Sequence, residues 1–107
     1  MNRGEVFRIK GPRKPRGHEQ AGPRFGVVLQ ADDFARLSTV IIAPTSRSAA
    51  PSTFRPEIEV AGEQTRVLIE QLQAVDPNRL GAIAGSLSRR ELEDVDSALR
   101  TVLGLGV

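Results

Sequence analysis

A polar loop runs straight into an apolar strand in the segment Gly17-His18-Glu19-Gln20-Ala21-Gly22-Pro23-Arg24-Phe25-Gly26-Val27-Val28-Leu29-Gln30. Glycine reaches positive φ and proline fixes φ, so the loop's glycines and Pro23 predict a shaped turn. The strand is expected to run from Phe25 to Gln30. Arg24 stands at the junction, where a guanidinium has rigid support and can face solvent. Such a position suits a residue that grips a phosphate.

Short strands account for much of the remaining chain. Besides the strand at 25–30, alternating or β-branched residues predict strands at 5–10, 38–43, 57–60, 66–72 and 82–87. The run at 38–43 is typical of a central strand, and we expect Pro44 to end it. Ala61-Gly62-Glu63 indicates a short hairpin turn. Residues rich in proline and glycine predict a long loop at 11–23, and small polar residues predict a second loop at 46–53.

The C-terminal part of the chain predicts one helix. Ser88 and Glu91 form a capping box, Gly104 is a stop signal, and Pro77 indicates an earlier short helical turn. The apolar positions of the helix follow at spacings of three, four and three: Leu92, Val95, Leu99 and Val102. The pattern favours a mainly β (α+β) fold, a small SH3-like antiparallel barrel of five to six strands with a C-terminal α-helix packed on it.

Composition limits the chemistry. The 107 residues are expected to form a single domain, residues 1–107. The chain has no Cys and one His, which argues against a disulfide framework, thiolate chemistry and a His-based metal site. No phosphate-binding or dinucleotide motif is present. We therefore expect no cofactor and no metal. There is no apolar run near the roughly 20 residues of a membrane span and no signal-peptide core, so we expect a cytoplasmic protein without a membrane partner.

Basic charge is concentrated at the N-terminus. Residues 1–24 carry seven basic residues against two acids, a net charge of +5, whereas residues 25–107 carry eight against eleven, a net charge of −3. Thirteen of the fifteen basic residues are arginines, which favours bidentate phosphate contacts. A GC-rich genome that encodes Arg in place of Lys would also explain that ratio, but not the clustering. The distribution indicates a polyanionic partner.

Three segments carry a family resemblance. They are Arg3-Gly4-Glu5-Val6-Phe7 with Gly17-His18-Glu19-Gln20-Ala21-Gly22-Pro23-Arg24 and Val27-Val28-Leu29; Val40-Ile41-Ile42-Ala43-Pro44-Thr45-Ser46; and Val67-Leu68-Ile69-Glu70-Gln71-Leu72-Gln73-Ala74-Val75-Asp76 with Arg79-Leu80. In this order and spacing they resemble the MazF/PemK toxins, ribonucleases of bacterial toxin–antitoxin pairs. Two positions depart from the family pattern: Phe25 stands where Pro is usual, and His18 where Ser is common.

The resemblance implies a site. An Arg and a Thr at these motif positions form the family's catalytic pair, and these roles carry over onto Arg24 and Thr45. A guanidinium with a fixed fork of donors suits the stabilisation of a crowded phosphorane. The substrate-binding residues are expected to be His18, Glu19, Gln20, Ser46 and Arg47, with Ser46 as a possible substitute donor.

Two roles in the loop stay open at this point. Glu19 is placed either to accept the 2′-OH proton or to hold Arg24, and we favour the holding role. His18 is the one side chain that titrates near neutrality without tuning. It serves either as an accessory RNA contact or simply as a solvated loop residue. Phe25 and Phe54 flank the two loops and could stack on a base, although burial is the default for phenylalanine.

The resemblance also implies an activity and partners. It predicts a sequence-specific, metal-independent endoribonuclease toxin that cleaves single-stranded RNA, such as mRNA, through its 2′-OH. It further implies a homodimer and a cognate antitoxin whose acidic flexible segment covers the RNA groove. The alternative is a non-catalytic toxin or binding module on the same barrel, such as a CcdB-like gyrase poison or an RNA-binding barrel.

Overall fold

The computed structural model describes residues 1–10 and 24–106 of the chain. The strands in this part of the chain are β1 (Glu5–Ile9), β2 (Arg24–Val28), β3 (Val40–Ser46), β4 (Glu57–Val60), β5 (Glu63–Val67), β6 (Gln73–Val75) and β7 (Leu80–Ser86). Three single 3-10 turns connect them: η1 (Asp32–Phe34), η2 (Ile69–Gln71) and η3 (Pro77–Arg79). One α-helix, α1 (Arg89–Leu103), follows the last strand.

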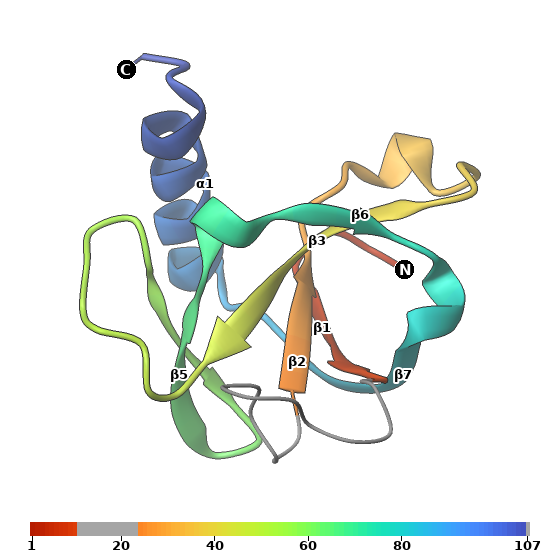
Figure 1. The fold of residues 1–107 in the computed structure, drawn as a ribbon, viewed down its shortest axis with the longest axis horizontal. Coiled ribbons are helices and arrows are strands. Elements are labelled where there is room, and N and C mark those ends of the chain that lie inside the picture. The colour runs from red at the N-terminus through yellow and green to blue at the C-terminus, as the bar shows by residue number, and fades with distance from the viewer. Residues whose placement is uncertain (11–23, 107) are drawn as a thin grey trace, which may run out of the picture.

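The strands form a curled antiparallel sheet, a half-barrel with a C-terminal helix (Figure 1). Their order is β4-β5-β3-β2-β1-β7, and β6 pairs with β3 off this path. Strand β3 is common to both halves, because it pairs with β2 up to Gly26↔Pro44 and with β5 from Thr45↔Val67 onward. This architecture confirms the mainly β fold with a C-terminal helix that the sequence predicts.

Two predicted strands have different bounds from those expected. Pro44 does not end its strand but lies inside β3, at the point where the pairing partner changes. The run expected as one strand at 66–72 is instead the end of β5, the turn η2 and the approach to β6. This chain segment must pass from one half of the sheet to the other, and Leu68, with φ −86° and ψ 79°, makes the corner. The described chain therefore has seven strands rather than five to six.

The sheet is buried on both faces around β2 and β3. Val27 and Ala43 belong to a core cluster that includes Val95 of helix α1. Their strand neighbours Val28 and Ile42 point the other way, into a second cluster. Side chains alternate along a strand, so a strand covered on both faces reads as a continuous apolar run. This explains the apolar runs at 27–29 and 42–43, whereas Ile41 is 39% exposed.

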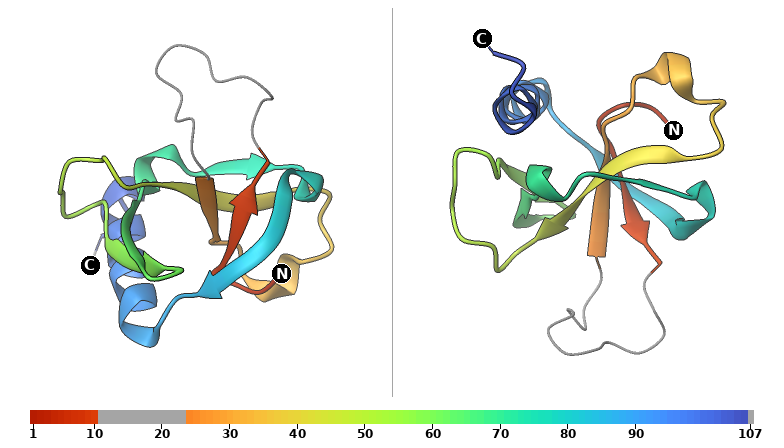
Figure 2. Two further views of the ribbon diagram at one scale, coloured as in Figure 1. Left: turned by 90° about the horizontal axis from the view of Figure 1, so that it is seen from below. Right: turned by 45° about the horizontal axis from the view of Figure 1, so that its top comes forward.

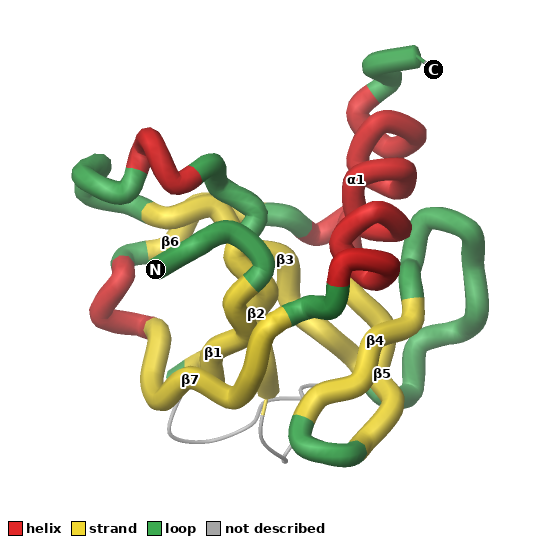
Figure 3. Tube along the Cα trace, turned by 180° about the vertical axis from the view of Figure 1, so that it is seen from behind, coloured by secondary structure: helices red, strands yellow, loops and turns green. Residues whose placement is uncertain are grey.

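Helix α1 closes the first core cluster. Ser88 Oγ accepts from the Glu91 N–H at 3.1 Å and Glu91 Oε1 accepts from the Ser88 N–H at 2.8 Å, which confirms the capping box. Gly104 ends the helix with φ 68°. The helix lies beside the β4–β5 half of the sheet, whereas the N-terminus and η1 lie at the other end (Figures 2 and 3).

Arg3 ties these parts together. Its backbone N–H donates to Asp32 Oδ1 at 2.7 Å, and its Nε donates to the Leu29 carbonyl at 2.8 Å. Its Nη2 also contacts Asp96 of helix α1 at 2.5 Å. One side chain thus joins the N-terminus, the end of β2 and the helix.

Gly26 is required where β1, β2 and β3 pack most closely. A Cβ atom at this position would lie 2.8 Å from Ile42 Cδ1 and 3.1 Å from Ile9 Cδ1. Ile42 is 1% exposed, so its end methyl has no free space to enter. We predict that Gly26→Ala lowers the free energy of unfolding by about 1–3 kcal/mol, the usual cost of overpacking. Urea denaturation followed by circular dichroism measures this change.

Gly81→Ala is the matched control. It also lies in a strand, but its added Cβ would meet its nearest neighbours at 3.6 Å or more, which is ordinary contact. The unfolding free energy of this variant should stay within about 0.5 kcal/mol of that of the parent chain, as is usual for a substitution that creates no clash. Equal losses in the two variants would show that the glycine at 26 is not needed for packing.

Candidate functional site

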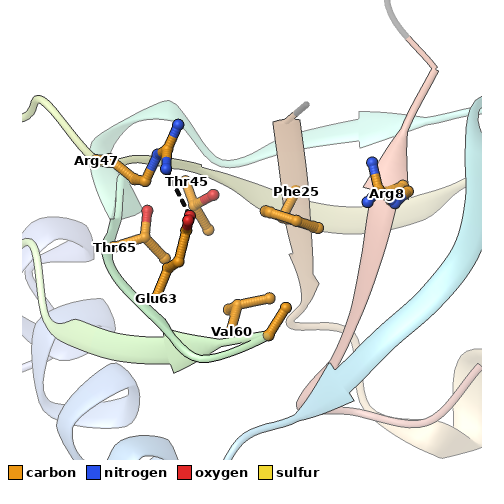
Figure 4. Close-up of a pocket in the computed structure, with 8 residues that line it drawn as sticks. Arg8, Phe25, Thr45, Arg47, Val60, Glu63 and Thr65 are labelled. Carbon is orange, nitrogen blue, oxygen red and sulfur yellow. Dashed lines mark hydrogen bonds and ion pairs between the residues drawn. The ribbon is translucent and has the colours of Figure 1, made fainter. Parts of the chain in front are cut away.

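A cavity of about 280 Å³ opens between the two halves of the sheet (Figure 4). Its walls come from β1, β2 and β3 on one side and from the β4–β5 hairpin on the other. The lining residues are Arg8, Phe25, Thr45, Arg47, Val60, Ala61, Glu63 and Thr65. The cavity therefore combines two cations, one carboxylate, two hydroxyls and an aromatic ring.

The first wall follows from strand register. Arg8 of β1 is paired with Phe25 of β2, and the Arg8 guanidinium carbon lies 5.5 Å from the centre of the Phe25 ring. This is the geometry of a cation–π contact. Thr45 follows Ala43 by two positions on β3, so both side chains point to the face on which Phe25 packs. The pairing thus fixes Arg8, Phe25 and Thr45 on one face of the sheet.

The second wall is a tight hairpin. Ala61 and Gly62 both have positive φ, 52° and 82°, which matches the hairpin turn expected at these residues. The turn directs Glu63 and Thr65 of β5 into the cavity opposite Thr45 (Figure 4). Thr65 is only 5% exposed, and its Oγ1 has no hydrogen-bond partner among the described residues. A buried hydroxyl without a partner is rare and costly.

An ion pair spans the cavity mouth. Arg47 Nη1 lies 2.5 Å from Glu63 Oε2. The two side chains are 62% and 60% exposed, so water screens their attraction and the pair contributes little to stability. Both groups can therefore exchange partners when a ligand enters.

The cavity contains two of the residues predicted for the site. Thr45, 3% exposed, and Arg47 both line it. Ser46 lies between them on the strand, so alternation directs its side chain to the opposite face, where its hydroxyl lies 3.3 Å from that of Ser48. His18, Glu19 and Gln20 lie outside the described residues.

Arg24 stands apart from Thr45. It is the first residue of β2 and pairs with Ile9, which packs against the second core cluster, on the face away from Phe25. Arg24 is not among the residues that line the cavity. Its Nε is buried and has no hydrogen-bond partner among the described residues. The strand end thus carries a donor that an incoming acceptor could satisfy.

The loop that follows β3 is tied to η2 by a second ion pair. Arg55 donates to Glu70 Oε2 through Nη2 at 2.8 Å and through Nε at 3.1 Å. Burial alone would raise the pKa of the Glu70 carboxyl, but the hydrogen bonds and the charge of Arg55 outweigh it and hold that pKa below its usual value. The Phe54 ring lies 5.3 Å from the Arg55 guanidinium carbon, outside the cavity lining.

Sequence reasoning missed three lining residues, Arg8, Glu63 and Thr65. The signal for Thr65 was present: it is a polar residue at an inward position of a strand whose next inward residue, Val67, is fully buried. The strand predicted at 66–72 began too late to include it. Arg8 could be placed only once its pairing with Phe25 was known.

No three His, Cys, Asp or Glu side chains in residues 1–10 and 24–106 are grouped as a metal site would require. In the same part of the chain, no helix has the length and apolar character needed to cross a membrane.

Comparison with known proteins shows the family. Residues 2–103 match the model of the PemK-like, MazF-like toxins of type II toxin–antitoxin systems. The candidate toxin Rv3098A of Mycobacterium tuberculosis is 38% identical over 104 residues, covering 96% of this chain and 97% of its own. The endoribonuclease MazF of Staphylococcus saprophyticus is 29% identical over 112 residues, which cover 98% of this chain and 92% of that protein. The chain belongs to the PemK/MazF toxin family, as the three sequence segments indicate.

Solved structures share the fold. An endoribonuclease from a mycobacterial species, in complex with its cognate antitoxin, superposes with a TM-score of 0.81 at 16% identity over 100% of this chain and 98% of the other. A chain of the MazE–MazF crystal structure from Deinococcus radiodurans gives a TM-score of 0.78 at 20% identity. The match covers 99% of this chain and 97% of that chain.

Proposed function

We propose that this chain is the toxin of a type II toxin–antitoxin pair and acts as an endoribonuclease on single-stranded RNA. The observation that carries the proposal is the position of Thr45. In a chain of this family, the threonine of the predicted catalytic pair lines a polar cavity beside two arginines. The net charge of +5 over residues 1–24 favours a polyanionic substrate.

The proposed reaction is an internal transesterification. A general base takes the proton of the ribose 2′-hydroxyl as its oxygen attacks the adjacent phosphorus. The bond from phosphorus to the 5′-oxygen then breaks as a general acid gives that oxygen a proton. The products are a 2′,3′-cyclic phosphate and a 5′-hydroxyl. The Thr45 hydroxyl donates to a phosphate oxygen from the cavity side. Arg24, at the start of the neighbouring strand, balances the charge that develops on the phosphorane.

This mechanism assigns no step to a metal ion. The arginine guanidinium is permanently charged and provides the electrostatic stabilisation that a divalent cation supplies in other nucleases. We therefore propose cleavage that is independent of metal.

The proposed partners follow from charge and size. A cognate antitoxin with an acidic flexible segment would compete with RNA for the basic side chains of the toxin, and this competition would inhibit cleavage. A chain of 107 residues with open sheet edges at β4 and β7 gains stability from a second subunit. Phe34 and Leu37, 57% and 55% exposed near η1, are apolar surface that such a subunit could cover. We propose a homodimer.

The first test is cleavage without metal. Purified protein incubated with a long RNA in EDTA should yield fragments with 2′,3′-cyclic phosphate and 5′-hydroxyl ends, read by gel and by end-specific ligation. Activity that disappears in EDTA and returns with magnesium would contradict the mechanism. Absence of cleavage under all conditions would favour a non-catalytic toxin.

Substitution of the catalytic pair is the second test. Arg24→Ala should reduce the cleavage rate by about 10²-fold, the usual effect of removing one transition-state donor. Thr45→Val, which keeps the buried shape and removes the hydroxyl, should cause a smaller loss. Circular dichroism should show both variants folded. Arg89→Ala, at an exposed position at the start of helix α1, is the control and should keep full activity. A folded Arg24→Ala variant with full activity would contradict the assignment.

The third test concerns the dimer. Sedimentation at micromolar protein should give twice the mass of the chain. Specific activity should fall on dilution below the dissociation constant, because pairing brings two basic N-terminal segments to one RNA. A monomer that cleaves RNA at the full rate would refute the homodimer.

A further inference from the structure

We propose that the cavity between the two halves of the sheet is a pocket for one unstacked nucleobase, stacked on Phe25 and read by Thr65. The inference rests on the proposed nuclease function, because the base belongs to an RNA whose phosphate reaches Thr45. It assigns to this cavity a role in choosing the cleavage sequence.

Phe25 provides the stacking surface. One side of its ring is occupied by the Arg8 guanidinium, whose carbon lies 5.5 Å from the ring centre. Figure 4 shows the ring between Arg8 and the two threonines. Every base has a π-face, so an aromatic ring in a basic cleft binds unstacked bases of single-stranded RNA.

Thr65 provides the reading group. Thr65 lines the cavity, and its Oγ1 is buried at the cavity wall without a hydrogen-bond partner among the described residues. A hydroxyl both donates and accepts, so it can pair with a carbonyl, a ring nitrogen or an amino group on the edge of a base. A ligand that satisfies this hydroxyl removes the cost of leaving it unpaired.

The exposed ion pair at the mouth completes the pocket. Arg47 supplies donors and Glu63 supplies acceptors, and the pair is solvated enough to rearrange around a base. Thr45 lines the same cavity as Thr65, so the bound base lies in a nucleotide next to the phosphate that is cleaved. Recognition of the base and cleavage are therefore coupled through one cavity.

The hydroxyl of Thr65 is tested by mapping cut sites. RNA ends produced by the parent chain and by Thr65→Val should be sequenced on the same transcripts. Thr65→Val should lower base selectivity by about tenfold at one position beside the cut, since a buried hydrogen bond is lost. Thr65→Ser should restore it. Thr101→Val removes a hydroxyl from helix α1, where it donates to the Ser97 carbonyl, and should change nothing.

Stacking is tested by Phe25→Leu, which keeps an apolar side chain against the core and removes the ring. Binding of single-stranded RNA should weaken by about tenfold. Phe7→Leu, which makes the same change against the second core cluster and outside the cavity lining, should bind as the parent chain does. Unchanged cut sites in Thr65→Val together with unchanged RNA binding in Phe25→Leu would overturn the pocket.

A titration without cleavage separates this inference from the nuclease proposal. The four nucleoside 5′-monophosphates should be added singly to the parent chain, with backbone amide shifts followed by NMR. Shifts centred on Phe25 and Thr65 for one base above the others would support the pocket even if no RNA were cleaved. Cleavage that persists while no nucleotide shifts these amides would leave the nuclease proposal standing and overturn the pocket.

Discussion

The position of Pro44 determines how the site is built. Proline has no N–H to offer a neighbouring strand, and the β2–β3 pairing ends at Gly26↔Pro44. The Pro44 carbonyl accepts from the Leu68 N–H at 2.8 Å, and β3 continues with β5 as its partner. One strand is thus shared by two halves of the sheet. The halves diverge at its end, and the cavity lies where they part. Thr45, the next residue, lines it.

The same geometry separates the two residues of the predicted catalytic pair. Successive side chains on a strand point to opposite faces, so Phe25 faces the cavity while Arg24 faces the side of Ile9. Thr45 and Arg24 can contact the same phosphate only at the edge of the sheet. At this edge β2 begins, and β3 changes its pairing partner from β2 to β5. A phosphate at that edge would receive the Thr45 hydroxyl from one face and the Arg24 guanidinium from the other. This arrangement leaves the interior of the cavity for a different part of the substrate.

The sequence predicted those elements whose local signals were strong. The capping box at Ser88 and Glu91, the turn at Ala61 and Gly62, and the turn that begins at Pro77 are local patterns, and each is confirmed. The corner at Leu68 was missed because an apolar run does not show where a chain leaves one half of a sheet for the other. Thr45 and Arg47 were placed in the site by family resemblance. Arg8 entered only through its long-range pairing with Phe25, which no local window contains, and Thr65 was missed because the predicted strand began one residue too late.

The charges indicate that the cavity and the strand end at Arg24 bind different parts of the substrate. Arg8 lies over an aromatic ring and Arg47 is paired with Glu63, so each cation already has a partner among the described residues. The Arg24 Nε has no such partner in the described chain, and it lies outside the cavity. Strong attraction for phosphate is thus expected at the strand end. The cavity, with its ring, two hydroxyls and an Arg47–Glu63 ion pair, is suited to a flat and polar-edged group such as a base.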